Sequence, residues 1–321
     1  MKTARVGALV VLVVAALLLA VRLRPQRVVN QLEKGPGHAA RQFESIGTLP
    51  PALAETSGLV VSRTQPGVLW SHNDSGDGPN LYAIDATGKL LATFQLNAEA
   101  RDWEDMDSGP CPDGVGTASD SPSPPVCLYL GDIGDNGHVR ETLTIYVVAE
   151  PSVARAGGSP QVVETRSFRY RYPDGPDDAE ALAVLPDGDM TIVTKGRSGT
   201  IGFFRLSRAA IARAIVSGEV LSAEYEGDSG IKPDAAISRL ATGAAVSPDG
   251  TTLAVRTYYE VYFFRATREG DKVHWSGPGE PCFLGKAEPQ GEAIDYLDQD
   301  LLLLTSERSS NASAVIHRVR C

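Results

Sequence analysis

The chain has 321 residues, of which 42% are hydrophobic, 32 are glycine and 21 are proline. This hydrophobic content is sufficient for a folded core, and the abundance of turn-forming residues favours β-structure over long helices. The 40 acidic residues outnumber the 30 Lys and Arg residues and give a formal net charge of −10. Such a balance excludes an extensive basic surface for nucleic acid and favours a cation or a polar ligand.

Residues 1–24 have the features of an export signal or a membrane anchor. Two basic residues precede an unbroken apolar run from Val6 to Val21, and Arg22 and Arg24 follow it. The run is slightly shorter than the roughly 20 residues of a comfortable span. No small-residue cleavage site precedes Arg22, which favours an uncleaved anchor. More positive charge follows the apolar run than precedes it. Because positive charge tends to stay in the cytoplasm, this distribution by itself would keep the domain on the cytoplasmic side.

Residues 25–40 contain Pro25, Gly35, Pro36 and Gly37 and predict a polar stalk, so the folded domain is expected at 41–321. If the N-terminal segment is an anchor, this stalk is expected to connect the domain to the membrane. We expect the protein to be monomeric.

The four cysteines predict two disulfide bonds, Cys111 with Cys127 and Cys282 with Cys321, with free buried thiols as the alternative. No pair has the C-x-x-C spacing of a zinc or redox site. Disulfides form in oxidising compartments. We therefore expect the domain outside the cytoplasm, in the periplasm or at the cell surface, and either secreted or anchored through the N-terminal segment.

A degenerate internal repeat determines the expected fold. Its clearest copies, at 179–188 and 242–250, are small-residue apolar strands that end in a Pro-Asp-Gly turn and are followed by another strand. Weaker copies begin at Ser57, Glu104 and Glu292. Small residues in the first strand suit the crowded axis of a β-propeller. The repeat thus predicts an all-β propeller with five blades, or six if the long excursions contain a further blade.

Each blade is expected to contain four strands, which in the third unit lie at about 179–185, 190–195, 201–206 and 220–227. A short helix is predicted at 207–218, where a serine N-cap precedes the apolar spacing and a glycine ends it. The last unit supplies only three strands, so the segment at 41–49 is predicted to complete it and close the ring.

The repeat alignment places several chemically active residues on one face. Glu104, Glu180 and Glu292 occupy equivalent positions at the start of the innermost strand and are predicted to ring the mouth of the central channel. Three carboxylates at equivalent positions would repel one another or bind a cation. Oxygen ligands without cysteine suit Ca²⁺ or Mg²⁺ better than Zn²⁺, and Ca²⁺ is preferred. These three glutamates are thus the candidate metal ligands and catalytic carboxylates.

Loops between the second and third strands supply the other candidates. Lys195 and Arg256 come from neighbouring blades and are predicted to hold an anionic group, although ion pairing with the glutamates would explain them equally well. His72 is a candidate general base or simply a hydrogen-bonding residue. Further candidate ligand-binding residues are Asp74, Asp132, Asp135, Asn136, Glu307 and Arg308. Taken singly, such Asp and Asn residues are also typical of tight β-turns.

Several of these segments resemble a family of secreted bacterial propeller proteins of largely unassigned function. The segments with this resemblance are 70–76, 102–105, 131–136, 178–182 and 291–293. More distantly, the acidic mouth is similar to those of the phytase-like and gluconolactonase-like propellers, in which an axial calcium ion supports hydrolysis. The resemblance implies a calcium propeller, but the catalytic residues of those enzymes do not match one by one.

The sequence therefore predicts a site that binds a small polar or anionic ligand, with hydrolysis of an ester or phosphoester as its chemistry. A non-catalytic envelope protein that binds a glycan or another protein is the main alternative. A glycosidase with paired carboxylates among the three glutamates is a further one. Neither a Gly-x-Ser-x-Gly elbow nor a P-loop is present.

Overall fold

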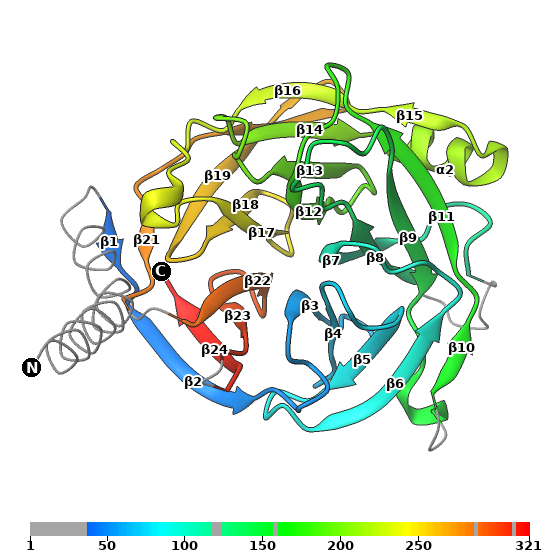
Figure 1. Cartoon of the computed structure of the whole chain (residues 1–321), viewed down its shortest axis with the longest axis horizontal. Helices are drawn as coiled ribbons and strands as arrows, with labels where there is room; N and C mark the ends of the chain where they lie inside the picture. Colours follow the sequence, from blue (N-terminus) through cyan, green and yellow to red (C-terminus); the bar gives the residue numbers. More distant parts are fainter. Residues whose placement is uncertain (1–36, 117–123, 157–159, 286–287, 310–312) are drawn as a thin grey trace, which may run out of the picture.

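The computed structural model describes residues 37–116, 124–156, 160–285, 288–309 and 313–321. Within them, five β-sheets are arranged as blades around a central axis, as Figure 1 shows. The five-bladed propeller expected from the repeat is confirmed. The expected signal or anchor at 1–24 lies outside the described residues, and no helix in the described part of the chain is long and apolar enough to span a bilayer.

Each blade is a meander of antiparallel strands that runs from the axis to the rim. The first blade contains β3 (Thr56–Val61), β4 (Leu69–Asn73), β5 (Asn80–Ile84) and β6 (Leu90–Leu96). The second contains β7 (Trp103–Pro110), β8 (Val126–Asp132), β9 (Leu143–Ala149) and β11 (Arg166–Arg171). The third contains β12 (Ala179–Val184), β13 (Met190–Thr194), β14 (Gly202–Leu206) and β16 (Glu224–Asp228).

The fourth blade contains β17 (Ala241–Val246), β18 (Thr252–Thr257), β19 (Glu260–Glu269), β20 (Lys272–Ser276) and β21 (Cys282–Phe283). The fifth contains β22 (Gln290–Tyr296), β23 (Leu302–Glu307), β24 (Val315–Arg320) and β2 (Gln42–Thr48). Strands β3, β7, β12, β17 and β22 surround the axis (Figure 1). Four of these strands are buried along their whole length or all but one residue, as the small-residue repeat predicts.

The ring closes through β2, which pairs antiparallel with β24 and supplies the outermost strand of the last blade. This confirms the role predicted for 41–49. The Cys282–Cys321 disulfide joins β21 of the fourth blade to the end of the chain beside β24. The preceding strand β1 (His38–Ala39) pairs with β21, so the last residues of the expected stalk belong to the propeller. The parallel pairing of β1 extends an edge that would otherwise expose unpaired backbone groups.

The third blade differs from its prediction in one strand. Segment β15 (Val220–Ser222) does not continue into the outer strand; it pairs parallel with β11 of the second blade. Strand β10 (Gln161–Val163) pairs in the same way with β6 of the first blade. These connecting segments therefore tie neighbouring blades together at the rim.

Other local predictions hold. Helix α2 (Arg208–Ser217) begins after Ser207, whose side chain accepts a hydrogen bond from the Ala210 amide, and ends at Gly218 in the left-handed region with φ 74°. Two 3₁₀ turns, η1 (Val153–Arg155) and η2 (Ala235–Ile237), lie in connections between strands. The second predicted disulfide, Cys111–Cys127, links the far ends of β7 and β8. Both disulfides indicate folding in an oxidising compartment.

Candidate functional site

A β-bulge interrupts the start of every innermost strand. The pairing with the second strand shifts register between Thr56 and Gly58, Trp103 and Met106, Ala179 and Ala181, Ala241 and Gly243, and Gly291 and Ile294. These shifts contain Ser57, Glu104, Glu180, Thr242 and Glu292, which are the residues that the repeat alignment makes equivalent. A bulge turns a side chain away from the normal alternation of a strand. The five-fold backbone distortion thus shapes one end of the channel, which we call the mouth.

Three carboxylates converge at the mouth. Oxygen atoms of Asp74, Asp102 and Glu104 all lie within 4.8 Å of one another, and this is the one group of potential metal ligands found among the described residues. Asp74 follows β4 of the first blade, whereas Asp102 directly precedes β7 and Glu104 is the second residue of that strand. Glu104 is 4% exposed, and the hydroxyl of Ser57 lies 3.5 Å from its Oε2. The cluster thus combines two adjacent blades.

The predicted set of three glutamates is therefore not the cluster that forms. Glu104 belongs to it, but Glu180 forms an ion pair with Lys195, and Glu292 lies outside the three-carboxylate group. Equivalent positions around a channel axis are separated by the width of the channel. Asp74 directly follows β4 and Asp102 directly precedes β7, so neither is fixed at one of these equivalent positions, and both approach Glu104.

Gly134 allows the loop after β8 to pack directly on this cluster. A Cβ atom at Gly134 would lie 2.3 Å from Oε1 of Glu104 and 2.5 Å from Oδ2 of Asp102. Its amide donates a hydrogen bond of 3.2 Å to the carbonyl of Asp102. Only glycine fits such a close approach of backbone to carboxylate. The loop is therefore a wall of the mouth and supplies no carboxylate to the cluster.

Lys195 is the cation in the middle of this acidic region. This residue is 5% exposed, and its side chain pairs with Glu180. Its positive charge also lowers the pKa values of Asp74, Glu104 and Glu292, although burial and neighbouring carboxylates outweigh it. One ammonium group therefore lies within electrostatic reach of carboxylates from several blades and cannot neutralise all of them.

Burial and mutual repulsion raise the pKa values of the mouth carboxylates. Burial, followed by the charges of Asp102 and Glu307, raises the pKa of Asp74 to about 7. Burial and then the charge of Glu307 raise the pKa of Glu292 to about 8. Burial also raises the pKa of Glu307 to about 7. Glu104, which is fully buried, has a pKa well above its ordinary value for the same reason. Such a cluster retains protons near neutral pH or binds a cation.

Among the described residues, Oε2 of Glu292 is buried and accepts no hydrogen bond. The same is true of Oδ1 of Asp74. A buried carboxylate oxygen without a donor is costly. These two oxygens thus mark places where a cation or a ligand donor would complete the site.

The remaining acidic residues predicted in the loop after β8 form a supporting network. Asp132 pairs with Arg140 at 2.7 Å, and Asp135 accepts a 2.8 Å hydrogen bond from the Arg140 amide. The amide of Asp135 donates to Oδ1 of Asp178 at 2.8 Å. Asn136 lies exposed at the tip of the loop. Asp132 and Asp135 thus fix the loop, whereas Asn136 is exposed to solvent.

The rim of the mouth carries further polar groups. Glu307 ends β23 and is partly exposed, and Arg308 is exposed beside it. Arg197 is 44% exposed and lies 3.3 Å from Oδ2 of the buried Asp178. Burial, followed by the charges of Glu292 and Glu307, raises the pKa of Tyr258, which places this phenol close to the same carboxylates.

Arg256 lies elsewhere than predicted. It is fully buried between the fourth and fifth blades, pairs with Glu288, and donates to the carbonyls of Ala293 and Thr305 at 2.7 and 2.9 Å. A Cβ at Gly291 would clash with it at 2.0 Å. Its guanidinium is committed to these acceptors and does not face the mouth. Arg197 is the arginine that accompanies Lys195 there.

His72 is also buried and belongs to β4, not to a loop. Its Nδ1 lies 3.0 Å from the Asn73 carbonyl, and its ring packs edge-on against Trp103 with 5.4 Å between ring centroids. Burial lowers the pKa of His72 to about 4. A neutral imidazole enclosed in this way supports the packing between the first two blades, which is the alternative that the sequence left open.

Sequence reasoning missed the carboxylates deeper in the channel. Asp105 accepts hydrogen bonds of 3.1 Å from the amides of both Leu182 and Ala244, which belong to the innermost strands of two other blades. Asp107 accepts a hydrogen bond of 2.7 Å from the Val184 amide, and Asp295 accepts one of 2.6 Å from the Val61 amide. Inner strands leave such amides unpaired at the axis. The acidic character of β7 and β22 was visible in the sequence, but these partners were not.

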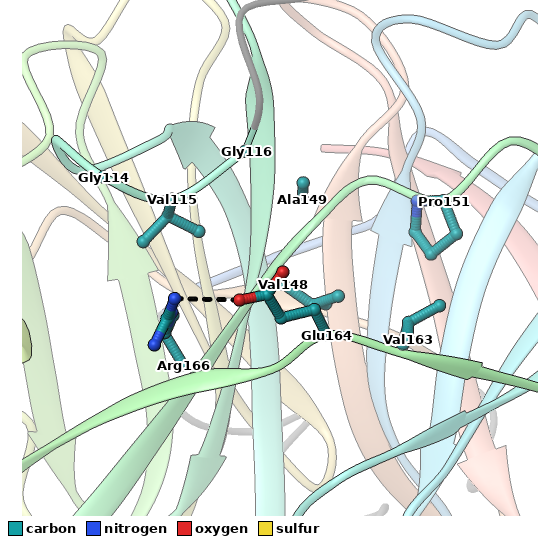
Figure 2. A pocket seen from close by; sticks show the side chains of 9 residues that line it. All are labelled: Gly114, Val115, Gly116, Val148, Ala149, Pro151, Val163, Glu164 and Arg166. Carbon is teal, nitrogen blue, oxygen red and sulfur yellow. Dashed lines mark ion pairs between the residues drawn. The ribbon is translucent and has the colours of Figure 1, made fainter.

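Surface pockets lie away from the mouth. One, with a volume of about 440 Å³, lies beside the second blade and is lined by Val115, Val148, Val163, Glu164 and Arg166, among others (Figure 2). The lining pair Glu164 and Arg166 is 79% and 53% exposed. The charged side chains that line this pocket are thus exposed, unlike the buried carboxylates of the mouth.

Comparison with known proteins adds the following. No protein-family model matches the sequence, and neither does any curated protein sequence. Among solved structures, a luciferin-regenerating enzyme is 12% identical, with 89% of this chain and 96% of that chain covered and a TM-score of 0.46. A PQQ-bound aldose sugar dehydrogenase from Streptomyces coelicolor is 11% identical, with 89% and 99% covered and a TM-score of 0.48.

A third protein, described as an oxidoreductase (glucose dehydrogenase) of Thermus thermophilus, is 10% identical, with 87% and 99% of the chains covered and a TM-score of 0.44. Similarity at this level transfers no activity, cofactor or substrate to this chain.

Proposed function

We propose that this protein is an extracytoplasmic propeller, secreted or held at the membrane by its N-terminal segment, that binds Ca²⁺ at the mouth. The observation that supports this proposal is the convergence of Asp74, Asp102 and Glu104 within 4.8 Å of one another. All three ligands are carboxylates, the site contains no cysteine, and His72 points into the core. Hard oxygen donors without geometric rigidity suit Ca²⁺ better than Zn²⁺ or Mg²⁺.

The bound cation would neutralise the repulsion that raises the carboxylate pKa values, and it would supply a Lewis-acidic centre for a small anionic or polar ligand. Lys195, which pairs with Glu180, would contact the same anionic group. Arg197 at the rim adds a second positive charge that is accessible to solvent. Without bound Ca²⁺, the carboxylates of the mouth would repel an anion. Recognition of an anionic ligand by Lys195 and Arg197 therefore requires Ca²⁺.

Hydrolysis of an ester or phosphoester is the reaction that this arrangement suits. Glu307 is partly exposed at the rim, and burial raises its pKa to about 7. A carboxylate with such a pKa can accept a proton from water near neutral pH. Lys195 would orient the scissile group, and Glu307 would remove the proton of the attacking water.

Thermal denaturation tests the cation site. Adding Ca²⁺ at about 100 times its dissociation constant to chelator-treated protein is expected to stabilise the fold by about 2.7 kcal/mol. This corresponds to a rise in Tm of about 5–10 °C for a domain of this size. Asp74→Asn is expected to abolish the rise, whereas Glu44→Gln, an exposed carboxylate on β2, should retain it. A wild-type Tm that ignores both Ca²⁺ and EDTA would contradict the proposed site.

A panel of phosphoesters and carboxylic esters then tests the reaction. Ca²⁺-dependent turnover that is lost in Glu307→Gln supports the hydrolase. A protein that binds Ca²⁺ but hydrolyses no compound of the panel would instead be a binding module for a glycan or a protein.

A further inference from the structure

We propose that Ser45, His317 and Glu288 form a second, nucleophilic site at the rim of the fifth blade, which attacks carboxylic esters without a metal ion. The hydroxyl of Ser45 lies 3.2 Å from Nδ1 of His317. On the other side of the imidazole, Nε2 lies 3.6 Å from Oε1 of Glu288. A nucleophile in contact with a base that a third group orients is the arrangement of activated serines, and it is recognised by geometry rather than by sequence order.

The three side chains differ in solvent exposure as a serine nucleophile requires: the hydroxyl is accessible, and the base and the carboxylate are buried. Ser45 is exposed on β2, whereas His317 is 9% exposed and Glu288 is 5% exposed. The ring of Phe43 packs on the imidazole with 4.5 Å between centroids. A reagent can thus reach the hydroxyl while the base and its carboxylate stay shielded from water.

The fold fixes the geometry of the pair. Ser45 and His317 are direct cross-strand partners on β2 and β24, and the register shifts between Ser45 and Gly47. Side chains directly opposite each other in a sheet are close neighbours. Bulges often occur beside functional residues, where they redirect a side chain. Ring closure by the N-terminal strand therefore creates the contact between two residues that are 272 positions apart.

Arg256 explains why Glu288 is available as the orienting carboxylate. Its guanidinium contacts Oε2 of Glu288 and leaves Oε1 directed at His317. Burial raises the pKa of Glu288, and the positive charge of Arg256 opposes that rise and fixes the orientation of the carboxylate. In the neutral tautomer with its proton on Nε2, Nδ1 of His317 would accept the Ser45 proton, and Glu288, 3.6 Å from Nε2, would stabilise the resulting imidazolium electrostatically.

The reaction balances without any added oxidant or metal. The Ser45 Oγ forms a bond to the carbonyl carbon of an ester, its proton passes to His317 Nδ1, and the bond to the alcohol oxygen breaks as His317 returns the proton to that oxygen. Water then attacks the acyl-serine and releases the acid. A fluorophosphonate traps the first step, because an Oγ–P bond forms, the P–F bond breaks and fluoride leaves.

The test is labelling of the purified full chain with a small alkyl fluorophosphonate in the presence of EDTA, followed by intact mass and peptide mapping. We expect one adduct, on Ser45, that is absent in Ser45→Ala. Ser167→Ala is the matched control, because Ser167 is an exposed serine on β11 of the second blade, opposite Tyr146 instead of a histidine. This variant should label like the wild type.

His317→Gln should slow labelling of Ser45 by about 100-fold or more while circular dichroism shows an intact fold. The absence of an adduct in the wild type would overturn the proposal. So would an adduct that persists in Ser45→Ala, a rate unchanged in His317→Gln, or labelling that requires Ca²⁺. Because the assay is run in EDTA, its result does not depend on the cation site at the mouth.

Discussion

Replacing Glu292 by Gln is expected to stabilise the cation-free protein at alkaline pH. Burial, followed by the charge of Glu307, raises the pKa of Glu292 from 4.5 to about 8, and its side chain is almost fully buried. Between these two pKa values the folded state holds a proton that the unfolded state has released. Stability therefore falls as pH rises through this window, at up to about 1.4 kcal/mol per pH unit for this one group.

The full penalty at pH 8 would be on the order of 5 kcal/mol if Glu292 acted alone. It acts together with Glu307, so removing one charge relieves only part of a shared repulsion, and we expect a gain of about 1–3 kcal/mol. For a domain of this size the gain raises Tm by about 2–12 °C. Glutamine keeps the shape of the side chain and mimics the protonated acid. At pH 5 the variant and the wild type should differ little.

The assay is thermal denaturation in EDTA at several pH values between 5 and 8.5. Glu180→Gln is the contrasting variant, because it leaves Lys195 buried without its ion-pair partner and should lower stability across this range. The reasoning is wrong if Glu292→Gln is less stable than the wild type at pH 8. The same conclusion follows if the two proteins show identical pH dependence, because Glu292 would then be ionised and well paired in the folded state.

Two further predictions concern a glycine beside the cation site and the disulfide at the ring closure. Gly134→Ala places a methyl group within 2.5 Å of the carboxylates of Asp102 and Glu104, so it should raise the apparent Kd for Ca²⁺, measured by titrating the rise in Tm, at least tenfold. Gly279→Ala is the control and should leave this Kd unchanged, because a Cβ at Gly279 meets only the Phe263 carbonyl oxygen, at 3.9 Å. Cys282→Ser opens a disulfide with a sequence separation of 39 residues and is expected to lower the free energy of unfolding by about 2–4 kcal/mol in urea denaturation. An unchanged midpoint would mean that β-pairing of β1 and β2 alone holds the closure.

The architecture was readable in the sequence because it depends on local patterns. Small apolar strands ending in Pro-Asp-Gly turns recur in the copies at 179–188 and 242–250, and each copy became an innermost strand and the turn after it. The Ser207 N-cap and the Gly218 terminus of α2 were equally local signals. The cysteine pairing and the closing role of 41–49 followed from counting strands and partners.

The sequence predicted the face on which the candidate site lies but not which side chains meet there. The repeat alignment placed Glu104, Asp74 and Lys195 on one face. The position of each side chain also depends on β-bulges, which no residue pattern in the sequence predicts. Arg256 was predicted at the mouth because it follows the same strand as Lys195. The structure instead buries it against Glu288, which comes from the connection between two blades.

What the sequence determined by itself is therefore the fold, the repeat and the face on which acidic residues gather, since strand periodicity and turn chemistry are properties of neighbouring residues. Only the tertiary structure decided which charges meet. It brought Asp74 to Glu104 across two blades, carried Asp105 to the amides of β12 and β17, and set Ser45 beside His317 through ring closure. Electrostatic interactions act through space over a few ångströms, so their partners are fixed by how the blades pack and not by distance along the chain.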